Sequence, residues 1–216
     1  GFLDLGRYYT HQMDLLGVDV YLNSEVTIEI IESAKPDAIV IATGSKPLVA
    51  DIPGVGGAGV VELRDVLDGK VETGKKVVII AADDDIQGLS VADFLVEQGR
   101  EVEVIVRSDD FGTRIEPCTR QAILQRLARG GVTMTNNSEV TEISGGTVSV
   151  RNVVTQEARP IEGVANVVIA FGGREDRALY DLLGDRVPEV HVIGDANGVR
   201  RIHDATREGA IVGRAL

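Results

Sequence analysis

Hydrophobic residues at the start of the chain recur at helical spacing, which predicts an amphipathic helix ended by Gly17. Beyond Gly17, the alternation of residues 18–22 predicts a strand, and a second short strand is expected over residues 25–30. Residues 37–42 form a nearly continuous apolar run, which is typical of a strand buried on both faces of a parallel sheet. The apolar positions of the first helix are Leu5, Tyr8, Tyr9, Met13 and Leu16.

Residues 75–82, with the apolar run 77–80, predict a second buried strand, which is followed by a helix and a third strand. A helix is expected over residues 88–98, ended by Gly99, and a strand over residues 101–107. This order is the βαβ element of a dinucleotide-binding fold. A further helix, residues 119–129, follows it.

The rest of the chain predicts an antiparallel meander and then a return to alternating strands and helices. Residues 132–161 contain short alternating strands with turns at Asn136-Asn137 and Gly145-Gly146. Earlier in the chain, between the two apolar strands, residues 43–47 predict a turn, and the glycine- and proline-rich residues 51–59 predict a crossing between domains. The later elements are a strand over residues 164–170, a helix over 176–183, a strand over 190–193 and a closing helix over 202–216. The fold class is therefore α/β.

Composition narrows the possible functions. The 216 residues, 44% of them hydrophobic, suffice for one large or two small domains. The single cysteine, Cys118, excludes a disulfide framework and a cysteine-ligated iron-sulfur cluster within this chain. The formal charge of -12 argues against nucleic-acid and membrane partners, and the lack of a long apolar run or leader predicts a cytoplasmic protein.

Three strand ends carry a resemblance to a known family. The segments Ala38–Gly44 and Val167–Gly173 each lead an apolar strand into glycine, and Val192–Ala196 ends a strand in Gly-Asp. In this order they resemble the flavoproteins with two dinucleotide domains. The closest resemblance is to the carboxy-terminal module of the long old yellow enzyme branch of NADH:flavin oxidoreductases. That branch includes trimethylamine dehydrogenase, histamine dehydrogenase and 2,4-dienoyl-CoA reductase. The segments Lys76–Asp83 and Ile202–Thr206 look most like those of the amine dehydrogenases.

The resemblance implies two Rossmann-like, three-layer βαβ domains, an NAD(P)-type domain being inserted in an FAD-type domain. The FAD-type domain would comprise residues 1–70 and 187–216, and the inserted domain residues 71–186. The family also implies FMN and a 4Fe-4S cluster on an amino-terminal TIM barrel, and a first glycine-rich loop ahead of Gly1. We therefore expect a fragment whose partners are the TIM-barrel domain of its own polypeptide and an electron-transfer flavoprotein.

Candidate cofactor-binding residues lie at the carboxyl ends of the FAD-type strands. By resemblance, Asp195 would accept hydrogen bonds from a ribityl or ribose hydroxyl of FAD or ADP, with the Gly194 backbone close by. Thr43 and Gly44 end the other strand, where glycine permits a turn and close approach to a ligand. The alternative for both strand ends is a plain turn without a ligand. A stripe of small residues in the closing helix, Ala205, Gly209 and Gly213, is typical of close packing.

The second phosphate loop departs from the family pattern. Gly88 takes the place of the third glycine, whereas Asp83 to Asp85 cover the first two glycine positions. A carboxylate about 5 Å from a phosphate oxygen costs roughly 3 kcal/mol at an effective dielectric of about 20, so the sequence argues against ordinary NAD(P)H binding. Arg107 follows the next strand, where it suits a 2′-phosphate or is simply an exposed residue at a strand end.

Three functions remain open. In the first, the chain belongs to an amine-dehydrogenase-like enzyme whose inserted domain has lost its nucleotide. In the second, the enzyme is an NAD(P)H-dependent reductase of the dienoyl-CoA type, as Arg107 and Gly88 would allow. In the third, the module is a non-catalytic scaffold or docks an electron-transfer partner. Neither Cys118 nor the three scattered histidines form a recognisable catalytic or metal-binding set.

Overall fold

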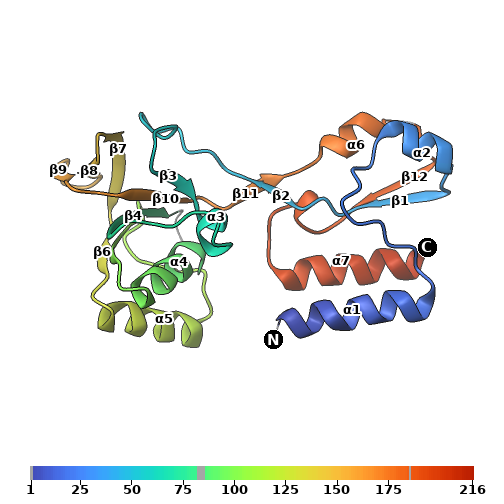
Figure 1. Ribbon diagram of the computed structural model, residues 1–216, viewed down its shortest axis with the longest axis horizontal. Coiled ribbons are helices and arrows are strands. Elements are labelled where there is room, and N and C mark those ends of the chain that lie inside the picture. The colour runs from blue at the N-terminus through green and yellow to red at the C-terminus, as the bar shows by residue number, and fades with distance from the viewer. Residues whose placement is uncertain (1, 82–85, 185) are drawn as a thin grey trace.

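The computed structural model describes residues 2–81, 86–184 and 186–216, which form two lobes (Figure 1). Two short strands, β2 (Ser45–Pro47) and β11 (Gly173–Glu175), pair antiparallel and make up the crossing between the lobes. The five-stranded lobe contains the chain between β2 and β11. The two-stranded lobe contains the chain before β2 and after β11.

A parallel sheet lies at the centre of the five-stranded lobe, between a layer of helices and an antiparallel sheet (Figure 1). Its strand order is β3 (Val60–Glu62), β10 (Asn166–Ala170), β4 (Lys76–Ala81), β5 (Glu101–Ile105) and β6 (Thr133–Thr135). The helices are α3 (Leu63–Leu67), α4 (Ile86–Glu97) and α5 (Pro117–Arg129). The antiparallel strands are β7 (Ser138–Ser144), β8 (Thr147–Asn152) and β9 (Ala158–Ile161).

Strand β4 is buried from both sides. Val77 and Ile79 pack with the helix residue Leu89, whereas Val78 packs with Val148 of the antiparallel sheet. The side chains of Val77, Val78 and Ile79 are all 0% exposed. A strand covered on both faces has to be apolar at its buried positions, and the apolar residues 77–81 reflect this requirement.

The two-stranded lobe contains a smaller core. Its parallel strands are β1 (Ala38–Ile41) and β12 (Glu189–Val192), and its helices are α1 (Phe2–Leu16), α2 (Ile28–Ala34), α6 (Ala178–Leu183) and α7 (Ile202–Ala215), with a 3-10 turn η1 (Gly194–Ala196). Among the described residues, the buried cluster consists of Ile31, Ile41, Leu183, Val187 and Ala196. Helix α7 buries none of its residues.

The α/β class and the dinucleotide-type parallel sheet are confirmed, and four local predictions are wrong. Residues 18–22 form no strand, because no described segment pairs with them and their side chains are exposed. Residues 25–30 enter helix α2, whose first turn is capped by the Thr27 hydroxyl accepting from the Ile30 amide. The turn predicted at residues 43–47 contains strand β2. Strand β6 belongs to the parallel sheet and not to the meander.

The crossing lies elsewhere than residues 51–59. This glycine-rich stretch packs on the antiparallel sheet, where the Ile143 amide donates to the Pro53 carbonyl over 2.9 Å. A Cβ at Gly54 would come within 1.8 Å of the Ile143 carbonyl oxygen, so close backbone packing accounts for this glycine. Strand pairing puts residues 60–62 in the five-stranded lobe, and the packing of Leu63 and Val66 puts α3 there as well. The packing of Leu183 puts residues 178–183 in the two-stranded lobe, so the lobes change at other positions than the predicted domain boundaries at 70 and 186.

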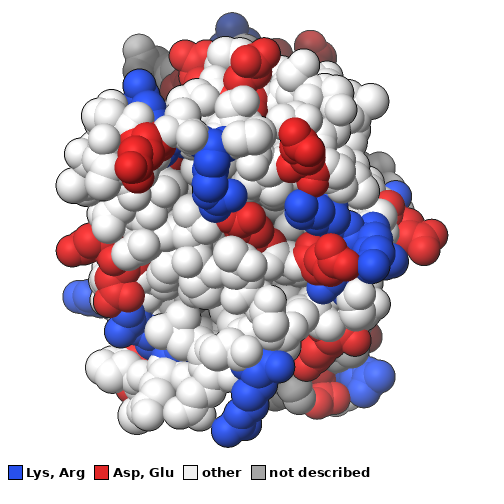
Figure 2. Space-filling model, turned by 90° about the vertical axis from the view of Figure 1, so that its left-hand side faces the viewer, with Lys and Arg blue, Asp and Glu red and all other residues white. Residues whose placement is uncertain are grey.

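The outer side of the five-stranded lobe carries mixed charge. Figure 2 shows lysine and arginine side chains interspersed with aspartate and glutamate on this face. Ion pairs of the lobe include Arg126–Asp93, at 2.7 Å, and Arg159–Glu103. In the described part of the chain, no helix is both long and apolar enough to cross a membrane.

Candidate functional site

The carboxyl ends of β1 and β12 meet at one edge of the two-stranded sheet. Ile41 is paired with Val192, and the Ile193 amide donates to the Ile41 carbonyl over 2.9 Å. Beyond these strand ends lies a hollow of about 350 Å³, which we call the strand-end hollow. It is lined by Ala42, Gly44, Ile193, Gly194, Asp195, Arg200, Arg201, Ile202 and Ala205.

Two glycines at the strand ends keep this hollow open. Gly44 and Gly194 have φ angles of +79° and +63°, in the left-handed region that glycine adopts without strain. A Cβ at Gly44 would meet no atom within 4 Å, and one at Gly194 would lie 3.5 Å from the Cβ of Ala205. The backbone at both positions is therefore accessible to a bound group.

Asp195 is held in place by the turn that follows it. Its carboxylate accepts from the Arg200 amide over 3.1 Å and from the Ser45 hydroxyl over 3.5 Å. An ionised carboxylate has about four lone-pair sites, so these two bonds leave acceptor capacity for a ligand hydroxyl. The sequence predicted Asp195 as an acceptor, and its partners Ser45 and Arg200 were not predicted.

Glu208 supports the same turn from helix α7. Its carboxylate accepts from the Gly194 amide over 2.7 Å, from the Asn197 side chain over 3.2 Å and from the Arg200 guanidinium. The hydrogen bond from Arg200, followed by that from the Gly194 amide, lowers the pKa of Glu208 from its ordinary value of 4.5. Sequence reasoning missed Glu208, because nothing in its local pattern marks a residue that binds a backbone amide fourteen positions earlier.

Thr43 is oriented toward the crossing and does not line the hollow. Its hydroxyl donates to the Asp176 carbonyl over 2.6 Å, and the Asp176 amide donates to the Gly44 carbonyl over 3.0 Å. The Asp176 carboxylate also pairs with Lys46 at 3.0 Å, which lowers the pKa of Asp176. Thr43 therefore ties the strand end at Gly44 to the returning chain.

The candidate residues of the inserted domain are not brought to the strand-end hollow. A Cβ at Gly88 would lie 2.5 Å from the Cβ of Ala81, so this glycine allows α4 to pack closely on the sheet. Arg107 lies 3.7 Å from Glu139 and its side chain is 71% exposed. The three aspartates at 83–85, on which the argument against NAD(P)H rested, lie outside the described residues.

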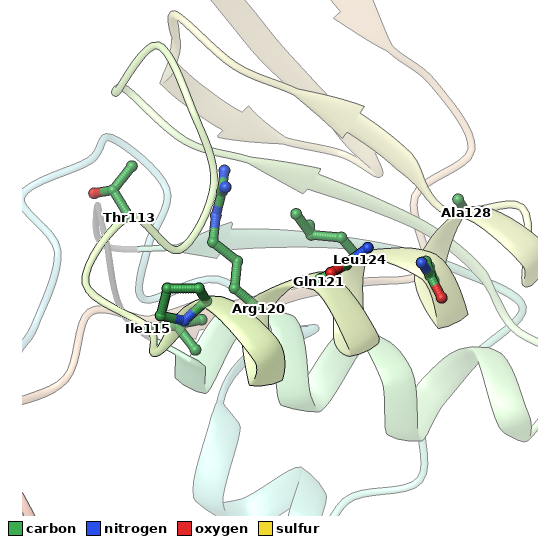
Figure 3. Close-up of a pocket in the computed structure, with 8 residues that line it drawn as sticks. Thr113, Ile115, Arg120, Gln121, Leu124 and Ala128 are labelled. Carbon is green, nitrogen blue, oxygen red and sulfur yellow. The ribbon is translucent and has the colours of Figure 1, made fainter.

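A larger hollow of about 620 Å³ lies on the outer face of α5 (Figure 3). It is open and lined by helix side chains such as Leu124, and its cation, Arg120, is already engaged. The Arg120 guanidinium donates to the Phe111 carbonyl over 2.7 Å and pairs with Asp110. Because size alone does not make a site, we favour the smaller strand-end hollow, where glycines, a carboxylate and arginines converge.

Residues 17–209 match the family described as pyridine nucleotide-disulphide oxidoreductase. The chain belongs to this family. A metal reductase of Desulforamulus reducens is 28% identical over 240 residues, which cover 96% of this chain and 35% of the relative. A solved 2-naphthoyl-CoA reductase complex is 33% identical with a TM-score of 0.88, covering 96% of this chain and 31% of that one. Histamine dehydrogenase from Rhizobium sp. 4-9 is 26% identical with a TM-score of 0.82, covering 92% of this chain and 33% of that one.

These matches confirm a dinucleotide-type oxidoreductase module. Histamine dehydrogenase lies in the long old yellow enzyme branch, so the predicted likeness to the carboxy-terminal module of that branch is also confirmed. Membership of the pyridine nucleotide-disulphide oxidoreductase family implies a fold for binding FAD and NAD(P). The chain spans about a third of the length of each of these three relatives.

Proposed function

We propose that this chain is the nucleotide-binding part of a flavin-dependent oxidoreductase and holds ADP or FAD in the strand-end hollow. The observation that carries the proposal is the meeting of two open glycines, Gly44 and Gly194, with Asp195 and two arginines at one sheet edge. Nucleotides bind at this edge in open α/β sheets. The hollow also offers both an acceptor for hydroxyls and cations for phosphates, which a dinucleotide requires.

Each group in the hollow has a chemical role in this proposal. Asp195 accepts hydrogen bonds from the ribose or ribityl hydroxyls, because the turn fixes its carboxylate and leaves lone pairs free. Gly44 and Gly194 let the ligand approach the backbone without a Cβ in the way. FAD, when bound, supplies electron transfer through its flavin, whereas ADP supplies binding energy alone.

The parent enzyme is proposed to be of the amine dehydrogenase type. In this scheme FMN and a 4Fe-4S cluster lie on a TIM-barrel domain outside this chain, and electrons leave to a protein such as an electron-transfer flavoprotein. The inserted domain would then retain its fold, including the Gly88 contact with Ala81, without holding NAD(P)H. The similarity to histamine dehydrogenase over 92% of the chain supports this scheme.

An NAD(P)H-dependent reductase is the second candidate, because 2-naphthoyl-CoA reductase shares 33% identity over 96% of the chain. Here Arg107 would leave Glu139 to meet the 2′-phosphate of NADPH. Anaerobic titration of the complete protein with NADH and NADPH separates the candidates. Unchanged flavin absorbance, with bleaching by an amine, supports the first candidate; rapid bleaching by either nucleotide supports the second.

The nucleotide itself can be identified after it is released from the complete protein by denaturation. We expect ADP or FAD in the unmodified protein and its loss in Gly44→Val, because a branched side chain would enter the hollow and strain a positive φ. Gly69→Val is the matched control, since Gly69 has a φ of +70° and open space but lies outside the hollow. Equal nucleotide retention by both variants would refute the proposed site.

A further inference from the structure

Two adjacent arginines line the strand-end hollow, but their partners differ. The Arg200 guanidinium pairs with Glu208 and donates to the Gly198 carbonyl over 3.1 Å. The Arg201 guanidinium instead donates to the backbone carbonyl of Arg114, which belongs to the five-stranded lobe. Among the described residues, no carboxylate forms an ion pair with the Arg201 side chain. The Arg200 guanidinium is thus paired with a carboxylate. The Arg201 guanidinium is not, and the nearby Asp204 carboxylate accepts instead from the Arg201 backbone amide over 3.3 Å.

The Arg114 carbonyl, which accepts the hydrogen bond from Arg201, lies in a loop with several contacts to its own lobe. Arg120 of α5 donates to the Phe111 carbonyl over 2.7 Å and pairs with Asp110. The Phe111 side chain is buried, and the Ile115 amide closes a turn onto the Gly112 carbonyl over 3.0 Å. The loop that holds Arg114 is therefore fixed by contacts inside the five-stranded lobe.

A guanidinium held by a neutral carbonyl keeps most of its binding capacity. It has five N–H donors in a planar fork, and a bond to one carbonyl leaves others for an anion. The fork matches the geometry of phosphate oxygens. The bond to Arg114 already restricts the side chain of Arg201 to few rotamers, so less conformational entropy is lost when phosphate binds. An arginine guanidinium that lines a hollow and has no carboxylate partner attracts an anion such as phosphate.

We infer that Arg201 is a positioning residue for the phosphate groups of the nucleotide, and that the loop at Arg114 holds it in place. Phosphate recognition in one lobe thus depends on a hydrogen bond that Arg201 donates to a carbonyl of the other lobe. This inference rests on the proposed function, because it assigns a part of the same hollow. It separates the two arginines: Arg201 recognises phosphate, and Arg200 shapes the turn with Glu208.

The test is calorimetric titration of the complete protein, depleted of nucleotide, with ADP and with adenosine. Arg201→Gln should lower ADP affinity about tenfold and leave adenosine affinity unchanged, because adenosine has no phosphate. Arg201→Lys should recover part of the ADP affinity, since lysine keeps the charge and loses the fork. Arg207→Gln, which removes an exposed arginine of α7 that does not line the hollow, is the control.

A second variant tests the link between the lobes. Arg120→Gln releases the Phe111 carbonyl and Asp110, and should lower ADP affinity several-fold from within the other lobe. The double variant Arg120→Gln, Arg201→Gln should lose no more ADP affinity than Arg201→Gln alone, because both substitutions act on the same interaction between Arg201 and phosphate. Arg126→Gln controls for charge, since Arg126 lies on the same helix and pairs with Asp93.

The outcomes distinguish the inference from the function on which it rests. If the unmodified protein binds ADP and Arg201→Gln binds it equally well, or no worse than Arg207→Gln does, the assignment of Arg201 is overturned and the proposed site stands. Additive losses from Arg201→Gln and Arg120→Gln overturn the interlobe dependence. If the unmodified protein binds neither ADP nor FAD, the proposed function and this inference fall together.

Discussion

The two lobes contain strands of the same sequence form, Ala38–Gly44 and Val167–Gly173, but bury them differently. Strand β10 has hydrogen-bonded neighbours on both edges and four of its five residues are buried. Strand β1 has one described neighbour, and only Ile41 of its four residues is buried. An apolar run thus predicts that a strand forms, whereas its burial depends on the layers that other segments supply.

The largest expected difference between the lobes is in the free energy of unfolding that is lost when one strand valine is replaced by alanine. Val78 of β4 is 0% exposed and Val40 of β1 is 41% exposed. Val78→Ala should lower the free energy of unfolding by about 2 to 3 kcal/mol, because it removes buried methyl groups and leaves a cavity. Val40→Ala should cost less than about 1 kcal/mol. Urea denaturation of both variants measures the comparison, and equal losses would refute it.

Two helical glycines should respond with opposite sign to the addition of one methyl group. A Cβ at Gly88 would lie 2.5 Å from Ala81, so Gly88→Ala should destabilise the five-stranded lobe by about 1 to 2 kcal/mol. A Cβ at Gly209 would lie 3.9 Å from Ile193, an ordinary contact. Gly209→Ala should therefore stabilise α7 by up to about 1 kcal/mol through helix propensity. Amide hydrogen exchange reports each lobe separately, and a loss of protection in both variants would contradict this.

The smallest effect concerns the start of helix α5. Glu116 accepts from the Thr119 and Cys118 amides, both at 3.0 Å, and these bonds lower its pKa from 4.5 to about 2. A carboxyl group whose pKa is lower in the folded than in the unfolded protein stabilises the fold at pH values above the unfolded pKa. This contribution is lost as the pH falls from 4.5 through about 2. NMR titration of the Thr119 amide should show the low midpoint and Glu116→Gln should abolish it. A midpoint near 4.5 would contradict the cap.

Sequence reasoning succeeded where the cause was local or steric. The run of residues 77–80 implies burial on both faces, and the structure buries it on both. Gly88 was predicted only as the third glycine of a phosphate loop, and its close packing against Ala81 emerged from the structure. The alternation of residues 18–22 misled, because a strand needs a partner and no described segment supplies one. Of the predicted cofactor-binding residues, Gly44, Gly194 and Asp195 line one hollow, whereas Thr43, Gly88 and Arg107 do not.

The contacts that hold the residues around that hollow in place could not be predicted from the sequence. The contacts of Glu208 with Gly194 and of Arg201 with Arg114 each engage a backbone group. Every residue has such a group, so no residue type identifies the partner. Only the three-dimensional path of the chain brings these pairs together.

The pairing of β2 with β11 has a mechanical consequence. The polypeptide passes between the lobes twice, and backbone hydrogen bonds join both passages into one short ribbon. Two separate tethers would allow the lobes to slide past each other, whereas a single ribbon favours bending and twisting at one place. The hydrogen bond from Arg201 to Arg114 is a second link, which such a motion would strain. Gly44 lies next to the ribbon and Ser45 within it. Any rotation of one lobe against the other therefore displaces the backbone next to Gly44, at the rim of the strand-end hollow.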